Sequence, residues 1–128
     1  MNIVVDPTRM FELKGEACKL TSVYLQTTVA NNILVVTGVA GKIIRVMGVL
    51  ADSTAGTISG LTFKSASGGT NIMHMVVPAN SAATPNALIP ITDSGYTECN
   101  TGEGLYVDCV TTAANVTLFY IVYTPQTT

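Results

Sequence analysis

The sequence predicts an all-β protein. Nineteen threonines and fifteen valines make the chain rich in residues that favour strands, and good helix formers are few. Apolar runs of five to ten residues are separated by clusters of small, turn-forming residues. No stretch repeats its apolar residues at the 3.6-residue spacing of a helix. With 128 residues, the chain is long enough for one stable domain and too short for two.

The first twenty residues differ from the rest. They include six of the fourteen charged residues, together with Pro7 and Gly15, and show no alternation of apolar and polar positions. We therefore expect an N-terminal arm over residues 1–20, with one short strand at Ile3–Val5, and a β-sandwich over residues 21–128. Two readings of the arm stay open: a disordered terminus, or a segment that orders on a neighbouring subunit.

Nine segments of the sandwich are predicted as strands. They are Val23–Val29, Ile33–Thr37, Lys42–Leu50, Thr57–Ser65, Ile72–Val77, Leu88–Ile91, Tyr96–Cys99, Leu105–Thr111 and Val116–Thr124. Seven to nine strands in one domain are typical of a single antiparallel β-sandwich, and the jelly roll is the common eight-strand version. We expect a jelly-roll-like fold.

Alternation along the strands predicts which faces are buried. In Lys42–Leu50, the side chains of Ile44, Val46 and Leu50 are expected to face the core. In Thr57–Ser65, apolar and polar residues alternate in the same way around Phe63. Each of these strands therefore has one dry face.

The last strand is apolar on both sides, and Ile72–Val77 has the same character. A two-layer sandwich buries one face of each strand, so we expect another subunit to cover the second face. The residues assigned to this subunit interface are Met73, Met75, Tyr120 and Val122.

The charge content limits the partners of the protein. Charged residues make up 11% of the chain, against about 25% in an average soluble domain. A surface with so few charges favours association with other subunits. The net charge of −2 and the scattered cations argue against nucleic acid and anionic membranes as partners. The apolar stretch Ile33–Leu50 is not expected to span a membrane, because Lys42 and Arg45 lie within it.

Candidate catalytic residues are few, and we expect no enzyme activity, no cofactor and no metal. The single histidine, His74, lies in an apolar strand, where a structural role is favoured over a base. A Cys–His pair with Cys99 or Cys109 stays open, because partners meet in space rather than in sequence. The spacing of the three cysteines, Cys18, Cys99 and Cys109, matches no metal-binding motif, and an odd number of cysteines suits a reducing cytoplasm. The acids Asp93, Glu98, Glu103 and Asp108 could pair for acid–base chemistry or hold calcium.

Five segments carry a resemblance to a known family. They read GKIIRVMGVL (41–50), LTFKSA (61–66), GYTEC (95–99), GEGLYV (102–107) and VTLFYIVY (116–123). In this order they resemble a group of small tailed-phage and prophage virion proteins that read GK-x-IRV, TFKSG, G-[WY]-FET, GEAL and LTY. The resemblance spans about two-thirds of the chain and leaves out the arm. The sequence departs from the family at Cys99 and at Gly104.

This resemblance implies a structural virion protein of a tailed bacteriophage, a capsid decoration (cement) protein. Such a protein binds the outer head surface as a homotrimer, ties together neighbouring major capsid proteins and is assembled in the host cytoplasm. The arm is the expected capsid contact, through the apolar side chains of Val4, Val5, Met10 and Phe11, which have no evident core partner.

Two other functions stay open. One is a tail, baseplate or fibre module that binds a host glycan or receptor through the loops Ser67–Asn71 and Asn80–Asn86, although these loops contain no aromatic residue. The other is a small hydrolase that uses Cys109 or paired acids.

Overall fold

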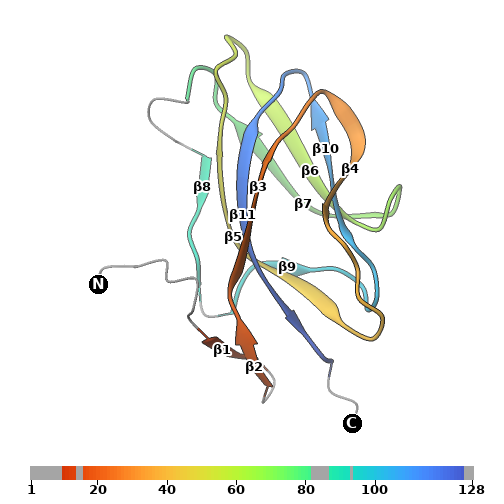
Figure 1. Ribbon diagram of the computed structural model, residues 1–128. Coiled ribbons are helices and arrows are strands. Elements are labelled where there is room, and N and C mark those ends of the chain that lie inside the picture. The colour runs from red at the N-terminus through yellow and green to blue at the C-terminus, as the bar shows by residue number, and fades with distance from the viewer. Residues whose placement is uncertain (1–9, 14–15, 82–86, 93, 126–128) are drawn as a thin grey trace, which may run out of the picture.

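The computed structural model describes residues 10–13, 16–81, 87–92 and 94–125 (Figure 1). These ranges contain strands and no helix, and every strand pair is antiparallel. The strands are β1 (Met10–Leu13), β2 (Glu16–Lys19), β3 (Thr21–Gln26), β4 (Ala30–Val36), β5 (Ile43–Asp52), β6 (Ser59–Ser65), β7 (Thr70–Val77), β8 (Ala87–Ile89), β9 (Thr97–Glu98), β10 (Leu105–Val110) and β11 (Asn115–Tyr123). The predicted all-β sandwich is confirmed, and each of the nine predicted segments contains a strand.

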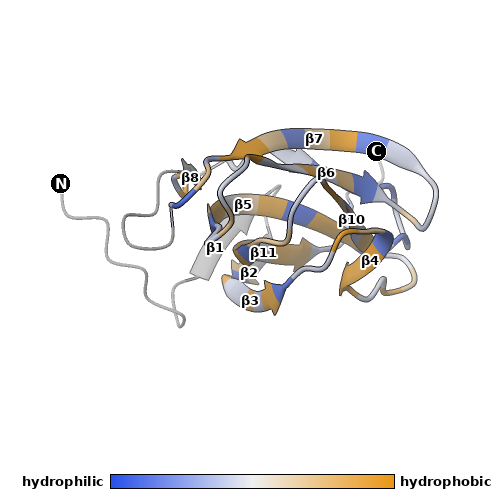
Figure 2. Cartoon of the chain, turned by 90° about the horizontal axis from the view of Figure 1, so that it is seen from above, coloured by the Kyte–Doolittle hydropathy of each residue, from blue (hydrophilic) through white to orange (hydrophobic). Residues whose placement is uncertain are grey.

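Strands β3 to β11 form two sheets packed face to face. Sheet I has the order β4-β10-β6-β7, and sheet II has the order β3-β11-β5-β8, with β9 continuing the edge beside β5. If β8 and β9 are counted as one interrupted strand, the eight strands run 2-7-4-5 in sheet I and 1-8-3-6 in sheet II. This is the strand order of a jelly roll. Figure 2 views the two layers end-on, with β6 and β7 above β5, β11 and β3.

The main core fills the space between the sheets. Sheet I contributes side chains that include Leu61, Phe63 and Val107, and sheet II contributes Val46 and Leu118. Each of these five side chains is fully buried. Burying one such side chain stabilises the fold by about 1.5–3 kcal/mol, so this interface is the main source of stability.

A β-bulge in β5 changes the predicted alternation. Tyr120 pairs with Val46 and Phe119 pairs with Gly48, so Met47 is an extra residue on β5. After the bulge, the residues of β5 that point to the core are shifted by one position. The fully buried Val49 therefore faces the main core. The prediction that Leu50 faces inward with Val46 was therefore wrong; Leu50 is half-buried on the other side.

A second layer covers one end of the outer face of sheet II. β1 and β2 form a hairpin, and the chain from β2 into β3 brings Cys18 and Leu20 onto this face. Both residues, which the sequence analysis assigned to the arm, are 2% exposed. They pack in a smaller cluster that includes Ile121 and Tyr123 of β11. The outer face of β11 is thus covered by its own chain, so its two-sided apolar character does not require a second subunit.

The residues predicted for a subunit interface lie against the main core in this single chain. Met75 belongs to that core, and Met73, Tyr120 and Val122 are partly buried against it. Of the predicted capsid contacts, Val4 and Val5 lie outside the described residues, as does the strand expected at Ile3–Val5. Of Met10 and Phe11, only the backbone is described, as part of β1. Among the described residues, no helix is long and apolar enough to cross a membrane.

Candidate functional site

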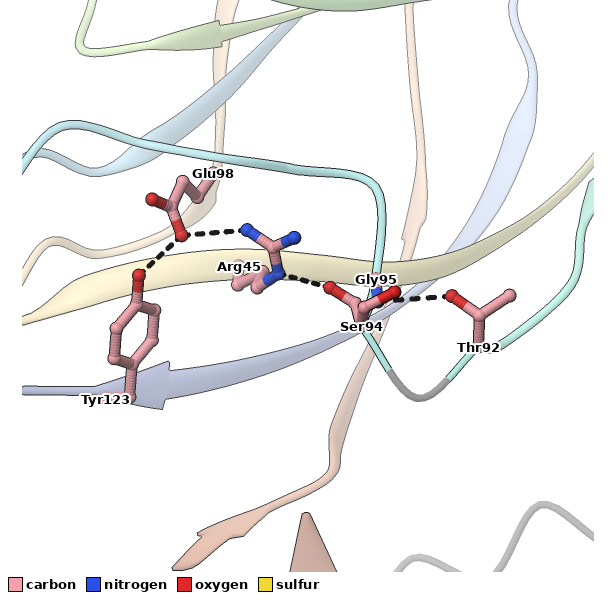
Figure 3. Close-up of polar contacts among 6 residues, drawn as sticks. All are labelled: Arg45, Thr92, Ser94, Gly95, Glu98 and Tyr123. Carbon is pink, nitrogen blue, oxygen red and sulfur yellow. Dashed lines mark hydrogen bonds and ion pairs between the residues drawn. The ribbon is translucent and has the colours of Figure 1, made fainter. Parts of the chain in front are cut away.

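A group of charged and polar contacts lies on the outer face of sheet II, at the end where β9 pairs with β5. Arg45 of β5 donates from Nη1 to Oε2 of Glu98 on β9 at 2.9 Å. The hydroxyl of Tyr123, at the end of β11, donates to the same oxygen at 2.5 Å. Figure 3 shows the three side chains converging from three strands. We call this group the Arg45–Glu98–Tyr123 cluster.

The cluster also holds the loop between β8 and β9. Arg45 donates from Nε to the carbonyl oxygen of Ser94 at 2.5 Å (Figure 3). Within the loop, the backbone N–H of Gly95 donates to Oγ1 of Thr92 at 3.1 Å. Gly95 has a φ of 69°, and a Cβ there would lie 2.8 Å from Sδ of Met47. The loop therefore needs glycine at this position, both for its backbone conformation and for its close approach to the bulge in β5.

The five segments that carry the resemblance have neighbouring positions at this end of the sandwich. The Ser65 hydroxyl donates to Oε1 of Glu103 at 3.0 Å and accepts from the backbone N–H of Asn100 at 2.9 Å. The backbone N–H of Gly102 donates to the carbonyl oxygen of Lys42 at 2.8 Å. The segments at 41–50, 61–66, 95–99, 102–107 and 116–123 thus hydrogen-bond to one another here, and the bonds hold loops and strand ends together.

Burial makes two side chains of this end poor acids. It raises the pKa of Tyr123 to about 12, and the hydrogen bond to the Glu98 carboxylate contributes in the same direction. Burial also raises the pKa of Cys99 to about 11, against a lowering effect of its hydrogen bond with Ser65. A thiol that stays protonated at neutral pH is a weak nucleophile. The contacts described at this site join strands and loops to one another.

The Cys–His pair considered from the sequence is not formed. Cys109 faces the main core and is 1% exposed, and Cys99 is buried in the same core. His74 lies on the opposite, outer face of sheet I, where its Nδ1 is 2.9 Å from Oγ1 of Thr62. Oγ1 of Thr27 lies 3.1 Å from Sγ of Cys109, so this thiol is part of a buried polar network.

The acidic residues considered as a catalytic pair or a calcium site are separated by their own partners. Glu98 binds Arg45 and Tyr123, Glu103 binds Ser65, and Asp108 pairs with Lys64. Asp93 lies outside the described residues. Among the side chains that the structure describes, no three His, Cys, Asp or Glu residues come together in a way that could hold a metal ion.

The outer face of sheet I combines two exposed valines with polar and paired charged side chains. Val110, Gly60 and Val76 are direct neighbours across β10, β6 and β7. Val76 is 51% exposed and Val110 is 46% exposed; we call them the outer valine pair. Lys64 and Asp108 on the same face pair with each other at 2.6 Å. The bonds from Lys64 and the backbone of Asn32 outweigh the effect of burial and hold the pKa of Asp108 below its ordinary value.

The fold and these contacts define a class of protein: a jelly-roll β-sandwich in which described charged side chains such as Arg45, Glu98 and Glu103 bind the chain's own loops and strands. No family model matches the sequence, and no curated protein is similar to it. One similar solved structure comes from a Bacillus endospore appendage, described as belonging to a novel family of disulfide-linked pili. It has a TM-score of 0.42 and 15% sequence identity, with 98% of this chain and 100% of that chain covered. Similarity at this level carries no information about function.

Proposed function

We propose that the chain is a structural virion protein of a tailed bacteriophage, a capsid decoration protein that binds the outer head surface as a homotrimer and stabilises the shell. The observation that carries the proposal is that the five segments resembling phage virion proteins meet at one end of the sandwich. They hold each other there through bonds such as those of Arg45 with Glu98 and Ser65 with Glu103. Proteins that share this fold would need these residues in the same order to make these contacts, even where their surface loops differ.

The chemistry of the described side chains supports a binding role over catalysis. The Cys99 thiol has a raised pKa, His74 lies apart from Cys99 and Cys109, and the acids Glu98, Glu103 and Asp108 have partners within the chain. Decoration of a shell is binding through many repeated contacts, which needs no reactive group.

The outer face of sheet I supports attachment to a protein surface. The outer valine pair flanks Gly60, which has no side chain, and the only two described charges between β6 and β10 neutralise each other. Exposed valines on a face whose described charges are paired favour contact with protein. We assign this face to the trimer or to the major capsid protein, with Val4, Val5, Met10 and Phe11 as further capsid contacts, proposed from the sequence.

Sedimentation with phage particles tests the proposal. The mass of the purified full-length chain is first measured by light scattering, and the chain is then mixed with expanded empty heads or with isolated tails. We expect a trimer that pellets saturably with heads and not with tails. Pelleting with tails alone, or with neither, would overturn the proposal and favour a tail module.

Two matched variants test the assigned face. Val76→Lys places a charge on the outer face of sheet I, and Val39→Lys places one at a position of similar exposure, 49%, in the loop between β4 and β5. We expect Val76→Lys to reduce trimer formation or head binding by at least about tenfold, because the lysine charge would have to be desolvated at the contact. Val39→Lys should bind like the unmodified chain. Equal binding by both variants would contradict the assignment.

A further inference from the structure

A shallow pocket of about 200 Å³ lies at the opposite end of the sandwich from the Arg45–Glu98–Tyr123 cluster. It is lined by residues 26–27 at the end of β3, 53–54 directly after β5 and 113–115 at the start of β11. Cavities of about 150 Å³ are known to hold a six-membered carbon ring, so this pocket has room for one ring. None of its lining residues contributes to the proposed attachment face on sheet I.

The floor of the pocket is rigid because its hydroxyl groups are buried and bonded. Thr27 is 3% exposed, and its Oγ1 both donates to the carbonyl oxygen of Ala114 and accepts from the Ala114 N–H, each at 3.0 Å. Ser53 is 1% exposed and donates to the carbonyl oxygen of Ala113 at 2.9 Å. A ligand would therefore meet a preformed surface and pay little ordering entropy.

The rim, by contrast, presents polar groups that the chain does not use. In the part of the chain that the structure describes, the Gln26 amide and the Thr54 hydroxyl make no hydrogen bond. Asn115 donates from Nδ2 to Oδ1 of Asp52 at 2.8 Å, which leaves one amide proton and the second Asp52 oxygen for a ligand. The rim thus offers both donors and acceptors, on flat amide and carboxylate groups.

An exposed aromatic ring stands beside this rim. Tyr24 lies two residues before Gln26 on β3, so both side chains are on the outer face of sheet II. Tyr24 is 60% exposed, and its hydroxyl lies 3.4 Å from Oδ1 of Asn115, to which it donates. Its ring is therefore available for stacking next to the polar rim.

We propose that this pocket binds a neutral carbohydrate through one pyranose unit. The hydroxyl groups of a sugar match a rim of mixed donors and acceptors, and the C–H face of the ring matches the aromatic face of Tyr24. Phosphate and other anions fit poorly, because no cationic side chain lines the pocket and Asp52 adjoins it. The proposal does not depend on where the protein is attached. The pocket is also a different place from the loops 67–71 and 80–86, which the sequence suggested as a glycan site.

Titration of the ¹⁵N-labelled full-length protein, followed by NMR, tests the site. The probes are glucose, galactose, N-acetylglucosamine and rhamnose, each raised to about 50 mM, with inorganic phosphate as the anionic comparison. We expect at least one sugar to shift the Gln26 and Asn115 side-chain amide signals saturably, with a dissociation constant in the low millimolar range that is ordinary for one sugar unit. Phosphate should leave these signals unchanged.

Variants of exposed residues separate this site from general surface effects. Tyr24→Ala should weaken binding by about five- to tenfold through loss of the ring, and Tyr24→Phe should stay within about twofold of the unmodified chain. Leu34→Ala, at a 50% exposed residue on sheet I, should not change binding. The proposal is overturned if no sugar shifts the two amides saturably, if phosphate shifts them more than the sugars do, or if Tyr24→Ala binds as tightly as Tyr24→Phe.

Discussion

The hydroxyl of Tyr123 donates a 2.5 Å hydrogen bond to Oε2 of Glu98, a residue 25 positions earlier in the chain. The same oxygen accepts from Arg45, so one carboxylate joins β5, β9 and β11. The side chains of Arg45 and Glu98 are 21% and 32% exposed, so water screens their pairing in part. The cluster ties the short strand β9 to the sandwich, since β9 itself pairs through two residues only.

Glu98→Gln is expected to lower the free energy of unfolding by about 2 kcal/mol, because it removes the charge that both donors share. Urea denaturation at pH 7 measures the change. Glu103→Gln is the matched control: its acceptor faces the neutral Ser65 hydroxyl, and an amide oxygen can replace it, so a change below about 0.5 kcal/mol is expected. Equal losses for the two variants would contradict a special role for Glu98.

The raised pKa of Tyr123 predicts a loss of stability at high pH. Ionisation begins near pH 10 in the unfolded chain and near 12 in the folded one. Because the folded pKa is the higher one, the stabilisation is complete below pH 10 and is lost as the pH rises toward 12. Tyr123→Phe should therefore show a smaller drop in urea midpoint between pH 8 and pH 11 than the unmodified chain. Tyr24→Phe, at an exposed tyrosine, should show the full drop.

Gly95→Ala is expected to cost about 2–3 kcal/mol. An added Cβ would lie 2.8 Å from both Sδ of Met47 and the carbonyl oxygen of Val46, and the backbone has a positive φ that alanine disfavours by about 1–2 kcal/mol. Gly56→Ala is the control, since a Cβ there meets nothing within 4 Å and φ lies outside the left-handed region. Thermal or urea unfolding that finds the two variants equally stable would refute the role given to Gly95.

Much of the sandwich could be predicted because its strands follow simple alternation. Leu61 and Phe63 on β6 face the core as their spacing requires, since β7 and β10 both pair with β6 in regular register from Gly60 to Phe63. The inward position of Val49 could not be predicted, because alternation within one strand does not show where a partner strand forces a bulge. That bulge follows from the pairing of β5 with β11, about seventy residues away.

The sequence pattern also could not predict which residues cover the outer face of sheet II. Cys18 and Leu20 look unremarkable in a mixed, charged segment, and their burial depends on Ile121 and Tyr123 at the other end of the chain. The Arg45–Glu98–Tyr123 cluster joins residues 53 and 25 positions apart, and nothing in their spacing indicates contact. The apolar second face of β11 was a valid signal of a covering layer, but it did not tell which segment provides the layer.

The three cysteines are expected to be unreactive in the folded protein. Cys18 and Cys99 are 2% exposed and Cys109 is 1% exposed, and none of the three is in a disulfide. At pH 8, a pKa of about 11 leaves roughly one Cys99 thiol in a thousand ionised. A chromogenic disulfide reagent should therefore detect almost no thiol in the native protein within minutes and three after denaturation in urea. Rapid native labelling of Cys109 would revive a nucleophilic role for that residue.

Deletion of residues 1–9 is expected to weaken head binding while the fold and the trimer persist. The deletion removes Val4 and Val5 but keeps the hairpin of β1 and β2, in which Met10 pairs with Lys19, so the cover over sheet II is preserved. Deletion of residues 1–12 removes most of β1 as well, and we expect it to lower the unfolding midpoint in addition, because β2 loses its ladder partner. Sedimentation with heads measures attachment, and urea unfolding measures the fold separately. If the chain without residues 1–9 binds heads as tightly as the full chain, the capsid contact lies elsewhere, and the outer valine pair on sheet I becomes the stronger candidate.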